Sequence, residues 1–293
     1  MIVLQNLIDA VSLGSVYALA ALGIGLIFSV MRLINFAHGE LIVAGSFTLF
    51  ALAGQPLAIL IFAALSVTVM LALGMERLAF RPLRAANPAS LLIASFAVSY
   101  FIQHAVLLIF GSRAMGVAFL SELGAAVEVG GLRLPLLQIV TIATTLCLLA
   151  GLTAFFRFSE TGLQMRAAAE DFAMARLLGV KANRVIAFAF AISGVLAAMV
   201  SFYLVAQTGS VSYKMGVGMV LIAFVSAVIG GMGSIAGAAL GGFLVGAVSV
   251  TLQSYLPADL RPYRDAFVFL LFILFLFWRP DGLLAGRGQR ERV

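Results

Sequence analysis

Long apolar runs alternate with short polar connections along almost the whole chain. They cover residues 7–30, 40–54, 56–75, 89–110, 135–156, 185–206, 218–230, 237–256 and 266–278. A helix needs ~20 apolar residues to cross a bilayer, and a lipid-exposed open strand leaves its backbone unpaired. The pattern predicts an all-α polytopic membrane protein with about eight or nine transmembrane helices. The runs 40–54 and 218–230 are short, which predicts half-helices or tilted segments.

Composition supports a single membrane domain that fills residues 1–293. Of the 293 residues, 63% are hydrophobic and 10% are charged, whereas soluble domains are about 25% charged. This excludes an ordinary soluble protein and leaves no room for a sizeable soluble domain. The amino terminus lacks a basic segment and a cleavage site, its first charge being Asp9, so the first run is expected to be a retained helix.

Positive charges are divided unequally between alternate connections. Thirteen of the arginines and lysines lie in the connections 31–40, 76–88 and 157–184 and in the tail 279–293, whereas five lie in 111–134, 207–217 and 257–265. Cytoplasmic connections of membrane proteins carry the excess of positive charge, so the first set is expected to be cytoplasmic. Nine crossings would place the amino terminus outside, and eight would place it inside.

The connection 157–184 predicts a short amphipathic cytoplasmic helix. Thr161 with Gln164 fits a capping box, and Gly179 fits a carboxyl-terminal stop. An interfacial helix lying in the headgroups is one interpretation. A docking helix for a soluble partner is the other, and Glu170 and Asp171 favour it because an anionic membrane surface repels acidic side chains.

Polar side chains also interrupt the apolar pattern between residues 32 and 40. Arg32, Asn35, His38 and Glu40 lie here with Gly39. If this is a tight cytoplasmic turn, Arg32 and Glu40 are solvated and have no role in transport. If it is a helix break lining a substrate path, the freed backbone groups need partners such as Asn35 or His38.

Glycines cluster from residue 230 to residue 246. The spacing of Gly231, Gly233 and Ala236 formally fits a dinucleotide-binding pattern, but an apolar run follows instead of a strand-helix-strand unit. The Gly230–Gly231 pair predicts a helix break. Gly233, Gly237 and Gly241 recur every four residues, which predicts close helix packing.

Motifs for catalysis are missing from the sequence. There is no phosphate-binding loop, only two lysines and two histidines, and no metalloprotease pair. The tripeptide 87–89 matches that of water and glycerol channels, but it occurs once and is better explained as a helix start at Pro88. The chain is expected to be a transporter or channel subunit and not an enzyme.

Four segments in order resemble the LivH-type permeases of bacterial branched-chain amino acid ABC importers. They are residues 23–40 (GIGLIFSVMRLINFAHGE), 76–84 (ERLAFRPLR), 166–180 (RAAAEDFAMARLLGV) and 230–237 (GGMGSIAG). The resemblance implies an ABC importer permease fold in the bacterial inner membrane. It also implies a second, LivM-type permease subunit, two cytoplasmic ATPase subunits that use ATP and Mg²⁺, and a periplasmic binding protein. No cofactor on this chain and no nucleic-acid partner are expected.

The resemblance also implies roles for individual residues. The coupling region that sits on an ATPase corresponds to Arg166, Ala169, Glu170, Asp171, Ala175, Leu178 and Gly179. The translocation path or the helix break beside it is expected at Arg32, Asn35, Phe36, His38, Gly39, Glu40, Gly230, Gly231, Gly233, Ser234 and Gly237.

Alternatives remain open for the substrate and for the class of transporter. Relatives in the same importer class carry urea, short amides or other amino acids, and no residue excludes these. A stand-alone channel or ion-coupled carrier is disfavoured because His104 is the one ionisable residue identified inside the apolar runs, and such carriers generally need a carboxylate relay. A purely structural subunit is disfavoured by the glycine breaks.

Overall fold

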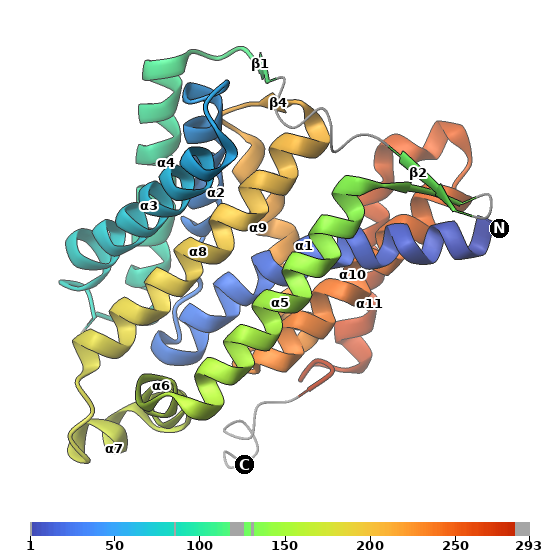
Figure 1. Ribbon diagram of the computed structural model, residues 1–293. Coiled ribbons are helices and arrows are strands. Elements are labelled where there is room, and N and C mark those ends of the chain that lie inside the picture. Colours follow the sequence, from blue (N-terminus) through green and yellow to red (C-terminus); the bar gives the residue numbers. More distant parts are fainter. Residues whose placement is uncertain (1, 85, 118–125, 130–131, 285–293) are drawn as a thin grey trace.

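Nine apolar helices form the body of the protein in the computed structural model, which describes residues 2–84, 86–117, 126–129 and 132–284. Six reach spanning length, with α3 counted together with the π-helix that follows it; these are α1 (Ile2–Met31), α3 (Leu57–Met75), α4 (Pro88–Phe110), α5 (Leu136–Phe158), α8 (Ala182–Thr208) and α10 (Ile235–Tyr255). Three are shorter, namely α2 (His38–Ala51), α9 (Met215–Gly230) and α11 (Arg264–Trp278). The predicted all-α polytopic membrane fold is confirmed (Figure 1).

Contacts at the helix ends place the amino terminus and the end of α11 at opposite faces of the protein. At one face, Ser254 Oγ donates to Asn6 Oδ1 at 3.2 Å and Gln138 Nε2 donates to Asp9 Oδ1 at 2.8 Å. At the other, the N–H of Leu283 donates to the carbonyl of Ile229 at 2.7 Å. The amino terminus and residues 279–284 therefore lie at opposite faces, which agrees with nine crossings and not with eight.

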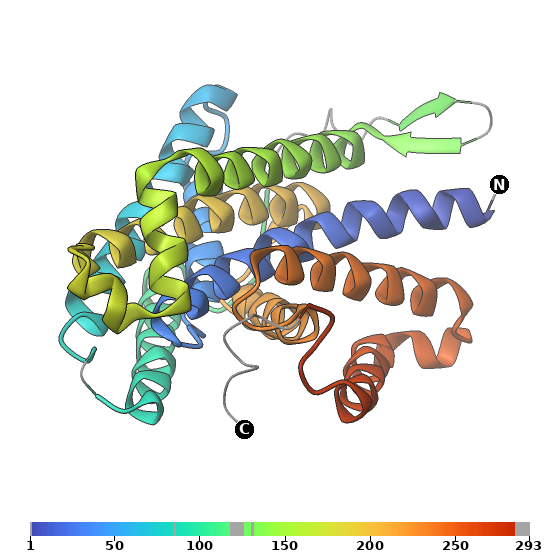
Figure 2. The same ribbon diagram turned by 90° about the horizontal axis from the view of Figure 1, so that it is seen from below.

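Short elements occupy the two faces (Figure 2). The amino-terminal face carries a hairpin of β2 (Ala126–Val129) and β3 (Leu132–Pro135), the pair β1 (Met115–Gly116) with β4 (Ser210–Val211), and the 3₁₀-helix η3 (Ala258–Tyr263). The opposite face, called here the α6–α7 face, carries the π-helix η1 (Glu76–Phe80), α6 (Glu160–Glu170) and α7 (Phe172–Leu177). The apolar pattern did not predict the strands.

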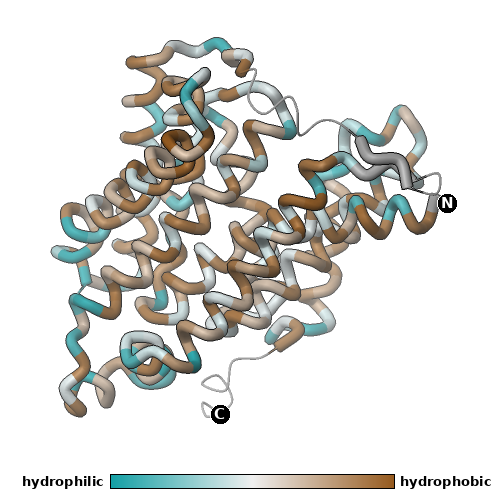
Figure 3. The backbone as a smooth tube through the Cα atoms, in the orientation of Figure 1, coloured by the Kyte–Doolittle hydropathy of each residue, from teal (hydrophilic) through white to brown (hydrophobic). Residues whose placement is uncertain are grey.

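Hydrophobic residues run along the helices, and hydrophilic segments gather near their ends (Figure 3). Helix α1 lies at the centre and is mostly buried. Asn87 caps α4 by accepting a hydrogen bond from the N–H of Ser90 at 2.7 Å, with Pro88 at the first helical position. The helix-start interpretation of residues 87–89 is confirmed.

Glycines bring α10 against two neighbours at once. A Cβ added at Gly237 or Gly241 would meet the backbone of α9, and one added at Gly242 or Gly246 would meet the backbone of α1. The predicted close packing is confirmed at Gly237 and Gly241 and is wrong at Gly233, which lies in the turn before α10 and touches no helix backbone closely. Close packing therefore begins at Gly237, where the helix itself has begun.

Candidate functional site

Helix α2 begins near mid-depth in the protein. Gly39 touches Gly216, which lies 14 residues before the end of α9, or about 21 Å at 1.5 Å per residue. His38 contacts Ser193, which is 11 residues into α8, or about 16 Å. In a hydrocarbon core ~30 Å thick, these distances place the start of α2 about 16 to 21 Å from the α6–α7 face, well inside the core. The run 40–54 is therefore a half-helix, as its length predicted.

The chain reaches this depth through a break after α1. Arg32 has φ of +54°, and its N–H donates to the carbonyl of Phe28 at 2.8 Å, so it ends α1 in the left-handed conformation. Asn35 then turns the backbone: its Oδ1 accepts from the N–H of Ala37 at 3.1 Å, and its carbonyl accepts from the N–H of His38 at 3.2 Å. Asn35 is fully buried, and its Nδ2 has no partner among the described residues.

His38 joins three helices at the start of α2. Its Nδ1 forms a hydrogen bond with Ser193 Oγ of α8 at 2.9 Å, and its ring lies against Gly23 of α1, where any Cβ would overlap the imidazole. The side chain is fully buried, and Nε2 has no partner within the described part of the chain. The structure therefore uses His38 as a contact between helices and leaves one ring nitrogen free.

Glu40 is buried in the first turn of α2 and is 1% exposed. Its Oε1 accepts a hydrogen bond from Ser99 Oγ of α4 at 2.9 Å, and Oε2 has no partner in the ranges described. The interpretation of residues 32–40 as a tight turn with a solvated Glu40 is wrong. His104 is not the one ionisable residue inside the bundle, so the scarcity of buried carboxylates no longer argues against an ion-coupled carrier.

Phe36 forms an aromatic wall beside these polar groups. Its ring stacks on Phe96 of α4 with centroids 4.4 Å apart and lies 5.6 Å from the ring of Phe224 of α9. A cavity of about 170 Å³ adjoins this wall between α4 and α9, and Phe36, Phe96, Ser99, Gln103, Val220 and Leu221 are among the residues that line it. Sequence reasoning missed the α4 and α9 residues because no motif marks them.

The glycine-rich turn lies elsewhere, on the α6–α7 face. Gly231 and Gly233 have φ of +107° and +91°, and Ser234 caps α10 by accepting from the N–H of Gly237 at 3.0 Å. Gly230 and Gly237 meet backbone to backbone, so the predicted helix break is confirmed. The path residues expected from sequence thus fall into two places: Asn35 to Glu40 lie at mid-depth, and Arg32 lies with the turn, its guanidinium about 3.8 Å from the Cβ position of Gly233.

The segment before residue 285 holds this turn in place. Leu283 and Leu284 donate their N–H groups to the carbonyls of Ile229 and Gly230, at 2.7 and 3.0 Å. These carbonyls are at the end of α9 and have no partner within that helix. A Cβ at Gly231 would overlap the carbonyl of Leu284. This contact satisfies the end of α9 and has no signal in the sequence.

The connection 157–184 forms two helices, so the single predicted helix is wrong. Asp171 is extended, with φ −143° and ψ 104°, and its Oδ1 accepts from the N–H of Met174 at 2.9 Å to start α7. A short acidic side chain can replace the helical bonding of the backbone in this way. The capping box is also wrong, because Ser159 caps α6 by accepting from the N–H of Gly162 at 2.9 Å.

Gly179 ends α7, as predicted. Its φ is +91°, its N–H donates to the carbonyl of Arg176 at 3.1 Å, and the N–H of Val180 donates to the carbonyl of Ala175 at 3.0 Å. This is the Schellman pattern that glycine favours. The coupling region expected from sequence is thus a compact unit with a fixed start at Ser159 and a fixed stop at Gly179.

The outer side of this unit combines two exposed leucines with charged side chains. Met165 and Ala175 are buried against the bundle, whereas Leu177 and Leu178 are 82% and 79% exposed. The other coupling residues expected from sequence are exposed except Ala169, which is half-buried; the exposed ones are Arg166, Glu170, Asp171, Leu178 and Gly179.

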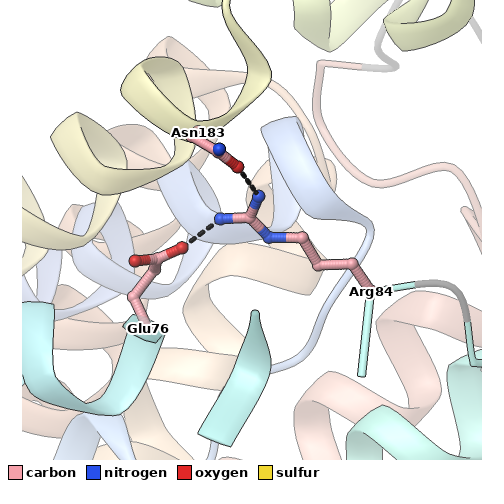
Figure 4. Close-up of polar contacts among 3 residues, drawn as sticks. All are labelled: Glu76, Arg84 and Asn183. Carbon is pink, nitrogen blue, oxygen red and sulfur yellow. Dashed lines mark hydrogen bonds and ion pairs between the residues drawn. The ribbon is translucent and has the colours of Figure 1, made fainter. Parts of the chain in front are cut away.

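Arg84 connects η1 with the start of α8 on the α6–α7 face (Figure 4). One guanidinium nitrogen pairs with the buried carboxylate of Glu76 in η1, and another donates to Asn183 Oδ1 at the start of α8. The sequence analysis used residues 76–84 as part of a basic cytoplasmic connection and as one of the four resembling segments, without a role for any single residue. The structure shows that they anchor α3 to the helix that follows the α6–α7 segment.

Similarity to known proteins covers nearly the whole chain. Residues 6–276 match the family described as branched-chain amino acid transport system, permease component. The high-affinity branched-chain amino acid transport system permease protein BraD of Pseudomonas aeruginosa is 37% identical, over 99% of this chain and 98% of its own length. The corresponding protein LivH of Escherichia coli is 34% identical, over 99% and 97%.

A solved structure shares the fold at low sequence identity. The chain resembles PsaBC from Streptococcus pneumoniae in complex with Fab, with a TM-score of 0.51 and 14% identity, over 97% of this chain and 92% of that one. The likeness supports the fold alone. The family match over residues 6–276 and the 37% identity to BraD over nearly the whole length show that the chain belongs to the family of permease components of branched-chain amino acid transport systems.

Proposed function

We propose that this chain is one of two permease subunits of an ATP-driven importer that carries branched-chain amino acids across the bacterial inner membrane. The observation that carries the proposal is the half-helix α2, which begins at mid-depth with Asn35, His38 and Glu40 fully or almost fully buried. Transporters place their substrate sites near the midplane at such interrupted helices. The names of the relatives BraD and LivH supply the substrate class.

The partners follow from the proposed class. A second, LivM-type permease subunit completes the path, two cytoplasmic ABC ATPase subunits hydrolyse ATP with Mg²⁺, and a periplasmic binding protein delivers the substrate. This chain binds neither ATP nor metal in the proposal. The α6–α7 face, which carries the excess of basic residues, is then the cytoplasmic face.

The α6–α7 segment is the proposed contact with an ATPase subunit. Leu177 and Leu178 are large, apolar and strongly exposed beyond the buried Ala175, and exposed apolar clusters of this kind mark interaction sites. Glu170 and Asp171 lie on the same segment and disfavour an anionic membrane surface. Motion at α7 reaches α8 over the few residues after Gly179, and Arg84 passes it on to α3 through Asn183 and Glu76.

Reconstitution tests the proposal directly. The chain is purified with the second permease and the two ATPase subunits, placed in vesicles with the binding protein outside, and supplied with L-leucine, L-isoleucine or L-valine. Uptake that requires ATP and the binding protein is expected. Uptake by this chain alone without ATP would indicate a channel or an ion-coupled carrier. ATP-driven uptake of urea or acetamide, without uptake of the amino acids, would show that the importer carries amides and not branched-chain amino acids.

A further inference from the structure

The cavity between α4 and α9 combines apolar walls with a polar edge. Phe36 and Phe96 form one wall, Val220 and Leu221 another, and Ser99 and Gln103 add polar groups. Ser99 is 11 residues into α4, about 16 Å along the helix, so the cavity lies at mid-depth. Tyr100 and Leu221 at its edge are 66% and 41% exposed, so it opens on the surface of this chain.

The carboxylate of Glu40 lies next to the cavity and is linked to it through a single hydrogen bond from Ser99. Ser99 lines the cavity and donates its hydroxyl to Glu40 Oε1 at 2.9 Å. Glu40 pairs with no basic side chain in the part of the chain that the structure describes, and its Oε2 is buried without a partner. The other buried carboxylate among the described residues, Glu76, has Arg84 as its counter-ion. An unpaired buried carboxylate is costly and marks a functional site inside a membrane.

The chemistry of this site fits an ammonium group that carries an apolar body. A branched-chain amino acid is a zwitterion whose α-ammonium group and aliphatic side chain match these two features, and its α-carboxylate then points away from Glu40. The ammonium loses water at mid-depth and needs a negative partner, whereas the side chain gains from an apolar wall. A cavity of about 170 Å³ is below the usual size of a complete ligand pocket, so the second permease subunit is needed to close it.

We propose that this cavity is the subsite that the substrate occupies during passage, with its aliphatic side chain against Phe36, Val220 and Leu221 and its α-ammonium toward Ser99 and Glu40. This rests on the proposed function and deepens it by naming the substrate contacts. The residues of α4 and α9 lie outside every motif that the sequence suggested.

Cysteine protection in the assembled complex tests the subsite. The single cysteine, Cys147, is replaced by serine, and one new cysteine is introduced as Leu221→Cys at the cavity. Leu108→Cys is the matched control, since it is on α4, is 86% exposed and is not among the lining residues. The rate of labelling by a maleimide is measured with and without L-leucine. L-leucine is expected to slow labelling at least threefold at position 221 and not at position 108.

Two analogues and two variants separate the parts of the proposal. The amine 3-methylbutan-1-amine, which keeps the ammonium and side chain of leucine, is expected to protect position 221, and 4-methylpentanoate, which lacks the ammonium, is not. Glu40→Gln is expected to abolish protection by L-leucine, and Ser99→Ala to weaken it, in complexes that still assemble by size-exclusion chromatography. Equal protection by 4-methylpentanoate, or protection unchanged in Glu40→Gln, would overturn the role of the carboxylate.

Failure of the subsite and failure of the proposed function give different results. ATP-driven uptake of L-leucine without protection at position 221 would overturn the proposed subsite and would still support the proposed importer function. Protection by L-leucine in a complex that shows no ATP-driven uptake supports the subsite and contradicts the importer.

Discussion

Arg84 is held between two helices that are far apart in the sequence, and replacing it tests how the α6–α7 face is stabilised. It pairs with Glu76, whose side chain is 7% exposed, and donates to Asn183 at the start of α8. Removing one partner of a buried pair costs about 3–5 kcal/mol, because the remaining charge is buried without a counter-ion. Since the side chain of Arg84 is 20% exposed, we expect Arg84→Met to lower the free energy of unfolding by about 3 kcal/mol, the lower end of this range.

Thermal unfolding of the purified chain in detergent, followed by circular dichroism, measures this loss. At 2–4 °C for each kcal/mol, the midpoint is expected to fall by about 6 to 12 °C. The double variant Glu76→Gln with Arg84→Met removes both charges. Its unfolding midpoint is expected to return most of the way to that of the unaltered protein, because no buried charge remains. Arg81→Met is the control, since Arg81 is exposed in the same connection. If the double variant unfolded at the same temperature as Arg84→Met, the uncompensated charge of Glu76 would not be the cause.

Three further predictions concern the α2 site and the α6–α7 segment. Gly23→Val is expected to reduce the yield of folded protein on size-exclusion chromatography, because even a Cβ at Gly23 overlaps the ring of His38, and His38→Ala should restore part of the yield. Leu177→Asp with Leu178→Asp is expected to change stability by less than about 0.5 kcal/mol, as exposed positions do, while co-purification of the ATPase subunits is lost. Gly179→Val places a branched residue at φ of +91°, which costs about 1–2 kcal/mol, and is expected to raise the ATP hydrolysed per leucine transported.

Matched variants control these predictions. Gly218→Ala on α9 meets no atom within 4 Å and is expected to leave the yield unchanged. Leu163→Asp on α6, which is 59% exposed, is expected to retain the ATPase subunits, because α7 carries the proposed contact. Normal ATPase co-purification with the Leu177 and Leu178 variants would contradict the docking proposal, and an unchanged ATP-to-leucine ratio in Gly179→Val would contradict the coupling role of α7.

The sequence by itself determined the helices and the break at the glycine pair. Apolar run length and helix-breaking glycines are local properties, so the nine runs each correspond to a helix, and Gly179 and Gly231 terminate α7 and α9. Local reasoning failed at Asp171, because an aspartate can lie on the polar face of one helix or cap the next, and the sequence suits both. The choice depends on how α6 and α7 pack against the bundle.

Only the tertiary structure decided whether the polar residues of the first motif are solvated. Asn35, His38 and Glu40 are adjacent in sequence to an apolar run, and their environment depends on partners 59 to 155 residues away, namely Ser99 of α4 and Ser193 of α8. A buried carboxylate and a solvated one have the same local sequence. The depth of α2, the cavity beside Phe36 and the anchor at Arg84 therefore followed from helix packing, which brings together side chains that no local pattern connects.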